Sequence, residues 1–115
     1  MKEKNIKLIK NINKMILEIH KKLKNISEEE FYDNIELTNM CTDCIFKIND
    51  NIKNINQNIK NKYKNINWNV IEENIYNDKV FKDSIKLSKI WNLSNNLLYN
   101  ELYNQLNIIL NDNRK

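Results

Sequence analysis

Apolar residues recur at alternating spacings of three and four along one stretch of this chain, between Ile35 and Ile66. Such spacing places them on one stripe of an α-helix. The 115-residue chain contains no Pro and no Gly, so no strong helix breaker interrupts the stretch. We therefore expect one helix of about 30 Å or more, against which the other helices pack. Its stripe is formed by Cys41, Cys44, Ile45, Ile48, Ile52, Ile55, Ile59 and Ile66.

The composition indicates the same fold class. Ile, Leu, Lys and Glu are abundant, and strict alternation of apolar and polar residues is rare, which is typical of all-α proteins. The chain is rich in Asn, a mediocre helix former, and lacks Ala, the best one. Because Ala, Gly and Pro all need G/C-rich codons, this bias indicates an A/T-rich genome. The length fits a single helical domain over residues 1–115, and we expect an antiparallel bundle of four to five helices.

Local signals mark the first helices. A seven-residue repeat of Ile and Leu predicts a helix from about Lys4 to Lys24. Ser27 and the glutamate three residues later form a capping box, which predicts a short helical turn that buries Phe31. The long helix then begins near Asn34.

The second half is less regular. Trp68 is expected to anchor a turn and to fill the core, and a short helix follows around Ile71. A further helix around Ile90 precedes a last one around Leu102. The stretch 94–96, Ser-Asn-Asn, either breaks these two apart or lies within one continuous helix.

Charge is unevenly distributed. The net charge is +4, but residues 1–25 carry eight Lys against two Glu, whereas residues 28–50 carry seven acids against one Lys. The two segments can attract one another. Alternatively, a lysine surface on the first helix, together with Tyr32 or Tyr63, binds RNA. The lysines of that alternative are Lys7, Lys10, Lys14 and Lys21.

No apolar run approaches the roughly 18 residues of a membrane span, and no signal peptide precedes the first helix, so we expect a cytoplasmic protein with no membrane association. Cys41 and Cys44 are expected to be free, buried thiols. Their spacing offers two zinc ligands, but a structural zinc site needs four, so we expect no metal and no cofactor. His20 is interpreted as an exposed or helix-capping side chain.

From Ser27 to Trp91 the chain resembles the HepT-like proteins of the HEPN superfamily, small helical toxins that pair with minimal nucleotidyltransferase antitoxins. The resemblance lies in Ser-x-x-x-Phe at Ser27 and Phe31, a long helix, Tyr-x-x-Ile-x-Trp-x-x-Ile from Tyr63, and a Trp 23 residues beyond Trp68. Both intervals, Phe31 to Trp68 and Trp68 to Trp91, fit the family pattern without a gap. The resemblance implies a HEPN-like helical bundle and a dimer.

The residues that make that family catalytic are missing. Its ribonuclease motif is an Arg, four to six residues, a His, one residue and a Tyr, and the alignment places Ile75, Val80 and Lys82 at those positions. The only His in the sequence is His20 and the only Arg is Arg114, in the wrong order for the motif. RNA cleavage needs a base near neutral pH and a fixed cation, so we do not expect an enzyme.

The sequence therefore favours a non-catalytic HepT-like protein that acts by binding another protein. The expected partner is a second copy of this chain, or a nuclease or nucleotidyltransferase of a defence or toxin-antitoxin locus. One variant is a counter-defence protein that inhibits a nuclease such as a CRISPR effector, an anti-CRISPR function. The expected partner-binding residues lie where the family has its cleft: Ile75, Tyr76, Val80, Phe81 and Lys82. RNA binding by the first helix is the alternative.

Overall fold

The computed structural model describes residues 3–75 and 87–113, and these residues form helices and turns but no strand. The expected all-α class is therefore confirmed for them. Residues 76–86, which include Tyr76, Val80, Phe81 and Lys82, lie outside the described residues, as does Arg114. In chain order the elements are α1 (Glu3–Leu23), α2 (Glu28–Asp33), α3 (Ile35–Lys53), α4 (Gln57–Lys62), α5 (Val70–Ile75), α6 (Leu87–Asn92), the π-helix η2 (Leu93–Tyr103) and α7 (Asn104–Asp112).

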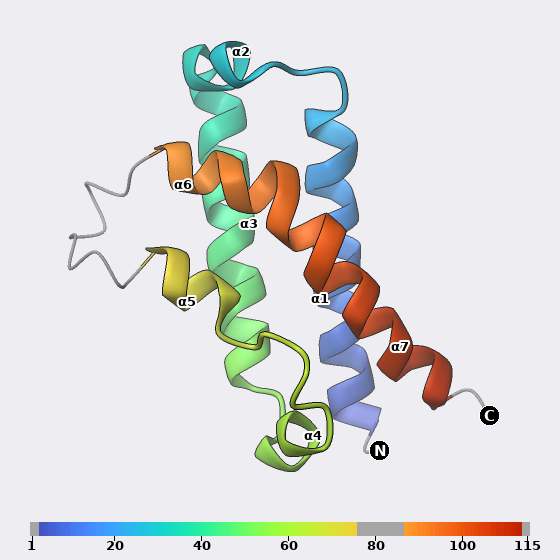
Figure 1. The fold of residues 1–115 in the computed structure, drawn as a ribbon. Helices are drawn as coiled ribbons and strands as arrows, with labels where there is room; N and C mark the ends of the chain where they lie inside the picture. The colour runs from blue at the N-terminus through green and yellow to red at the C-terminus, as the bar shows by residue number, and fades with distance from the viewer. Residues whose placement is uncertain (1–2, 76–86, 114–115) are drawn as a thin grey trace.

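Three long helical segments make the core of the arrangement. Figure 1 shows α1 and α3 side by side and antiparallel, with α2 across one end and α4 at the other. The segment formed by α6, η2 and α7 crosses both of them, and η2 packs mainly on α1. The buried apolar side chains of these segments form one cluster, which also takes in Trp68.

Helix α1 follows its sequence pattern closely. The predicted range of Lys4 to Lys24 agrees with the observed helix to within one residue at each end. Its repeat of Ile and Leu is buried throughout, because residues three and four apart share one face. Just beyond the helix, Asn25 adopts a left-handed conformation with φ of 68°. Asn tolerates this conformation better than most residues, so in a chain without Gly it supplies the turn that ends the helix.

The predicted capping box is confirmed at the start of α2. The Glu30 N–H donates to Ser27 Oγ at 3.1 Å, and the Ser27 N–H donates to Glu30 Oε1 at 3.3 Å. Phe31 is fully buried, as expected. Asn34 then begins α3, because its side-chain oxygen accepts a hydrogen bond from the Leu37 N–H at 3.0 Å.

The long helix predicted from Ile35 to Ile66 is shorter than expected, since α3 ends at Lys53. The apolar repeat continues past this point and stays buried at Ile55 and Ile59, but the backbone turns. Asparagine side chains provide the physical reason: Asn54 Nδ2 donates to the Asp50 carbonyl at 2.9 Å, and Asn56 Oδ1 accepts from the Asn58 N–H at 3.1 Å and begins α4. Such local bonds compete with helical ones. The prediction of burial was right, and that of a continuous helix was wrong.

The C-terminal segment runs on without a break. Of the two alternatives for residues 94–96, the continuous helix is confirmed, although from Leu93 to Tyr103 it has π-helical winding. Ser94 faces the core and is buried, whereas Asn95 and Asn96 are exposed. A π-helix of this length is unusual, since π-helical winding mostly occurs as single turns.

The turn around Trp68 behaves as predicted. Trp68 is only 8% exposed, and its indole Nε1–H donates to the Tyr63 carbonyl at 3.1 Å, so the ring fills the core with its polar atom satisfied. Cys41 is buried as expected and Cys44 is half-buried; both are free. No helix among the described residues is long and apolar enough to cross a membrane.

Candidate functional site

Of the five expected partner-binding residues, Ile75 is the one that lies among the described residues. Ile75 is the last residue of α5 and is 2% exposed, so its side chain belongs to the core and presents almost no surface. The other four residues, Tyr76, Val80, Phe81 and Lys82, lie outside the described residues. The assignment of a partner cleft to this segment stays a prediction.

Apolar and aromatic side chains gather where α2, α3 and α6 meet. The Phe31 ring lies 5.1 Å from the Trp91 ring and 5.9 Å from the Tyr32 ring, measured between centroids. Trp91 and Tyr32 are half-buried, so part of each ring reaches the surface. Leu87, one turn before Trp91, is 41% exposed, and Ile35, at the start of α3, is 73% exposed. We call Tyr32, Ile35, Leu87 and Trp91 the apolar surface.

The lysines of α1 form a second surface. Lys7, Lys10, Lys14 and Lys21 are all exposed, and with Lys24 they follow one another at steps of three, four or seven residues. That spacing places the first four on one side of α1, and Lys24 follows just beyond its last residue; we call these five lysines the lysine face. The ion pair found among the described residues joins Lys53 and Glu72 at 3.6 Å, and none there involves α1. The acidic segment 28–50 therefore does not neutralise this face by direct pairing.

Beside the lysine face lies a stack of three aromatic rings, which we call the aromatic ladder. The His20 ring lies on the Tyr99 ring with 3.6 Å between centroids and 7° between planes. Tyr99 in turn stacks on Tyr103 at 5.2 Å and 19°. All three residues are half-buried. His20 was interpreted as an exposed or helix-capping side chain; it lies half-buried in the last turn of α1, where a helix distant in sequence supplies a ring partner.

Hydrogen bonds fix the position of the ladder. Asn13 Nδ2 donates to Asn107 Oδ1 at 3.0 Å, which sets the register of α7 against α1. Asn13 and His20 precede Lys14 and Lys21 by one residue each, so the C-terminal segment lies along one edge of the lysine face.

The two tyrosines named in the RNA-binding alternative are elsewhere: Tyr32 packs on Phe31, and Tyr63 Oη donates to Asp112 Oδ2 at 3.2 Å.

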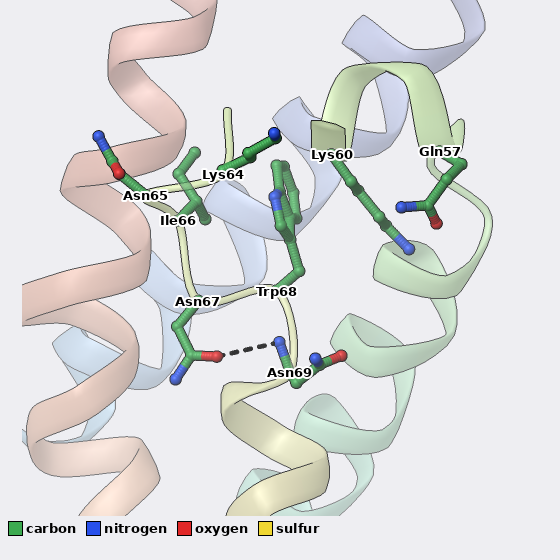
Figure 2. A pocket seen from close by; sticks show the side chains of 8 residues that line it. All are labelled: Gln57, Lys60, Lys64, Asn65, Ile66, Asn67, Trp68 and Asn69. Carbon is green, nitrogen blue, oxygen red and sulfur yellow. Dashed lines mark hydrogen bonds between the residues drawn. The ribbon is translucent and has the colours of Figure 1, made fainter. Parts of the chain in front are cut away.

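A polar hollow opens at the turn between α4 and α5 (Figure 2). Its volume is about 580 Å³ and its wall carries two lysines and four amide side chains. The Asn69 N–H donates to Asn67 Oδ1 at 3.2 Å, which holds one side of the turn. Because Trp68 is nearly buried, the hollow offers no open aromatic face. The lining residues are Gln57, Lys60, Lys64, Asn65, Ile66, Asn67, Trp68 and Asn69.

The two thiols are not arranged for reactivity. Burial raises the pKa of the Cys41 thiol to about 11, and the neighbouring Ser94 hydroxyl offsets part of that rise. Burial, followed by the Glu18 carboxylate, also raises the pKa of Cys44. Both thiols are therefore protonated at neutral pH, the form that is a poor nucleophile and a poor metal ligand. Within residues 3–75 and 87–113, no group of three or more His, Cys, Asp or Glu could hold a metal ion.

The chain was also compared with models of protein families, with curated proteins and with solved structures. None of the three comparisons gives a match. The resemblance to HepT-like proteins rests on the residues quoted for it in the sequence. Of these, Phe31 and Trp68 are buried and Trp91 is half-buried against Phe31.

Sequence reasoning identified the lysines of this region but missed the aromatic ladder. Tyr99 and Tyr103 are four residues apart, a spacing that brings two side chains together on one helix, and this was the available signal. The partner of Tyr99 could not be found in the same way. His20 lies at the other end of the chain, and the pairing depends on the crossing of η2 over α1.

Proposed function

We propose that this chain is a non-catalytic HEPN/HepT-like protein that acts by binding another protein. The partner is a nuclease or nucleotidyltransferase of a defence or toxin-antitoxin locus, and the binding inhibits it. A CRISPR effector is one such nuclease. The observation that carries the proposal is that the residues shared with the HepT pattern are used to build a core, whereas the catalytic positions hold groups that cannot cut RNA.

The aromatic residues shared with the HepT pattern pack in or against the core. Phe31 and Trp91 come from the two ends of the resemblance, and their rings are in contact at 5.1 Å. Trp68, at its middle, is nearly buried with its indole N–H bonded. Side chains with such contacts stabilise a fold, and a fold can be retained after its chemistry is lost.

The chain lacks the base and the cation that RNA cleavage of the HEPN type uses. Ile75 takes the position of the family's Arg and is buried at 2% exposure, so no cation is fixed there. His20 is stacked on Tyr99 of η2 and forms no ion pair among the described residues. A phosphodiester cleavage of the HEPN type requires a base and a cation at one place.

The apolar surface supplies a place for contact. Ile35 and Leu87 are large apolar side chains that remain exposed; Ile35 follows the half-buried Tyr32 by three residues, and Leu87 precedes the half-buried Trp91 by one helical turn. Leu87 also lies five residues after Lys82, the last of the residues that the resemblance assigns to the partner cleft. Aromatic and large aliphatic side chains surrounded by polar residues are typical of the centre of a protein interface.

The test uses purified components. The chain is mixed with the nucleotidyltransferase and with the RNA-guided nuclease of its native host, and affinity and nuclease inhibition are measured by calorimetry and a cleavage assay. We expect Leu87→Glu and Ile35→Glu to weaken binding by at least about tenfold, because each places a charge in an apolar contact. Ile108→Glu is the matched control, since Ile108 is also exposed, at 57%, but lies on α7.

Two results would contradict the proposal. One is RNA cleavage by the purified chain that is lost in Val80→Ala or Lys82→Ala. The other is equal loss of binding in Leu87→Glu, Ile35→Glu and Ile108→Glu, which would mean that charge alone, and not this surface, decides the affinity.

A further inference from the structure

The lysine face is positively charged along its whole length. Lys7 and Lys24 mark its ends, which on a straight helix lie about 26 Å apart. The exposed acids of α1 are few, Glu3 and Glu18, against the five lysines of the face. No ion pair among the described residues neutralises any of the five. A row of unpaired ammonium groups of this length matches the spacing of several consecutive phosphates.

The aromatic ladder runs along one edge of the same face. Its rings are held flat on one another at 3.6 Å and 5.2 Å, and each is half-buried. The position of the ladder is fixed, because the Asn13–Asn107 bond ties α7 to α1 one turn beyond Tyr103. An ordered column of half-exposed rings is a platform on which another flat ring can stack.

The C-terminal segment adds amides to this edge and little negative charge. Within its span of 87–113 the acids are Glu101 and Asp112, and Asp112 already accepts a hydrogen bond from Tyr63. Asn96 and Asn100 lie on either side of Tyr99 along the segment and are exposed, with Asn100 Nδ2 donating to Asn96 Oδ1 at 2.8 Å. Amide side chains of this kind bond to the edges of unpaired bases.

From these three features we infer that the chain binds single-stranded nucleic acid along α1. The phosphates contact the lysine face, and one or two bases stack on the aromatic ladder. This inference is independent of the proposed function, because it uses α1 and η2 and not the apolar surface.

The ladder is what favours a single strand over a duplex. Bases in a duplex are already stacked and paired, so their faces are not available to protein rings. Lysine also interacts with phosphate as a point charge, without the planar geometry by which arginine reads base edges in a groove. We therefore expect little sequence preference and a strong dependence on salt.

The experiment is fluorescence anisotropy with labelled U12, dT12 and a 12-base-pair duplex. The full chain should bind U12 or dT12 more tightly than the duplex, and comparing the two strands tells RNA from DNA. If all five lysines contact phosphates, raising the salt from 50 to 200 mM should weaken binding by about 100-fold. Equal or tighter binding of the duplex, or no binding of either strand, would overturn the inference.

Matched lysine variants separate this face from general charge. Lys10→Gln/Lys14→Gln removes two lysines of the face, and Lys62→Gln/Lys64→Gln removes two exposed lysines outside α1, at the end of α4 and just beyond it. The first pair should lower the magnitude of the salt slope by about 1.4, and the second should leave it nearly unchanged. Equal effects of the two pairs would overturn the inference.

Ring variants test the ladder separately. Tyr99→Leu should weaken binding of the single strand by about tenfold, whereas Tyr99→Phe keeps the ring and should bind as the natural chain does. Circular dichroism confirms that each variant is folded, and His20→Gln, which removes the half-buried outer ring, repeats the test if Tyr99→Leu is unstable. Unchanged affinity in a folded variant that lacks one of these rings would contradict stacking.

Discussion

Helix α1 and the α3–α4 region carry the same seven-residue apolar repeat and both contain several Asn, yet α1 continues for 21 residues whereas α3 ends at Lys53. The difference lies in the partners of the asparagines. In α1, Asn5 and Asn13 are buried and bond to distant segments, through Asn56 and Asn107. After α3, Asn54 bonds to its own backbone.

Asn therefore has two opposite effects on helices in this chain. A buried Asn that bonds across the core leaves its own helix intact and fixes a neighbour. At the end of α3, Asn54 bonds to the backbone four residues earlier, a local bond that competes with the helical ones, and the Asn56 side chain then begins α4. The apolar repeat therefore predicts which side chains are buried in both regions, and the asparagines decide where the backbone turns.

The largest expected effect comes from removing apolar contacts at equivalent points of the two regions. Ile16→Ala in α1 should lower the free energy of unfolding by about 3–4 kcal/mol, because Ile16 is fully buried and the cavity cannot collapse between α1 and its neighbours. Ile59→Ala in α4 should cost less, about 2 kcal/mol, because Ile59 lies at the edge of the core in a six-residue helix. Urea unfolding measures both. An equal cost at the two sites would show that the regions are equally well packed.

A smaller effect is expected from breaking the bonds that α1 makes across the core. Asn5→Ala removes the acceptor of the Asn56 N–H, so we expect a loss of about 1–2 kcal/mol in urea unfolding. Asn11→Ala is the control, since Asn11 is exposed on the same helix. It should be neutral or slightly stabilising, because Ala is the better helix former. A loss at Asn11 as large as at Asn5 would contradict the role given to the buried bond.

The turn after α3 should respond more weakly. Asn56→Ala removes the side chain that begins α4 and should lower stability by about 1 kcal/mol. Hydrogen exchange should show faster exchange at the Asn58 N–H, with α1 unaffected. Asn58→Ala is the matched control, because the Asn58 side chain is exposed and has no capping role. Unchanged exchange in Asn56→Ala would mean that the turn does not depend on this cap.

The smallest effect concerns Cys41, in the first half of α3, and appears only at alkaline pH. Burial holds the pKa of Cys41 at about 11, above the ordinary thiol value of 9.0 to which it returns on unfolding. The protonated thiol therefore contributes stability below pH 9 that is lost as the pH rises towards 11. Urea unfolding between pH 8 and 10.5 should show a steeper decline for the natural chain than for Cys41→Ala. Parallel declines would contradict the assigned burial.

Thiol labelling at pH 8 offers a control for that experiment within the same helix. Cys44 is half-buried and Cys41 is buried, so a thiol reagent should modify Cys44 first. Cys44→Ser leaves Cys41 as the single thiol, and its slow reaction then reports opening of the core between α3 and η2. Fast labelling of Cys41 would mean that this part of α3 is less protected than α1.

Features of the fold that depend on local chemistry were predictable from the sequence. The extent of α1, the capping box at Ser27 and the start of α3 at Asn34 each depend on residues within one or two turns. The end of α3 was not predicted, because the same Asn can extend, end or bridge a helix according to which partner is in reach. The π-helical winding of η2 was missed as well, since its burial pattern was interpreted with an α-helical period.

The candidate sites also have a part that local spacing predicts and a part that depends on how the helices cross. The lysines of α1 follow from spacing along one helix, and the structure leaves all four predicted ones exposed. The aromatic ladder required knowledge of how η2 crosses α1, which no local pattern contains. Of the expected partner cleft, the described residues include Ile75 alone, so the assignment of that cleft stays a prediction.

The winding of η2 has a mechanical consequence for α7. Each π-helical turn holds more residues than an α-helical turn, so a change of η2 to ordinary winding would rotate everything that follows it about the helix axis. Asn107 would then swing away from Asn13. The Asn13–Asn107 bond therefore depends on the winding of a neighbouring segment, and a substitution that alters the pitch of η2 would break it.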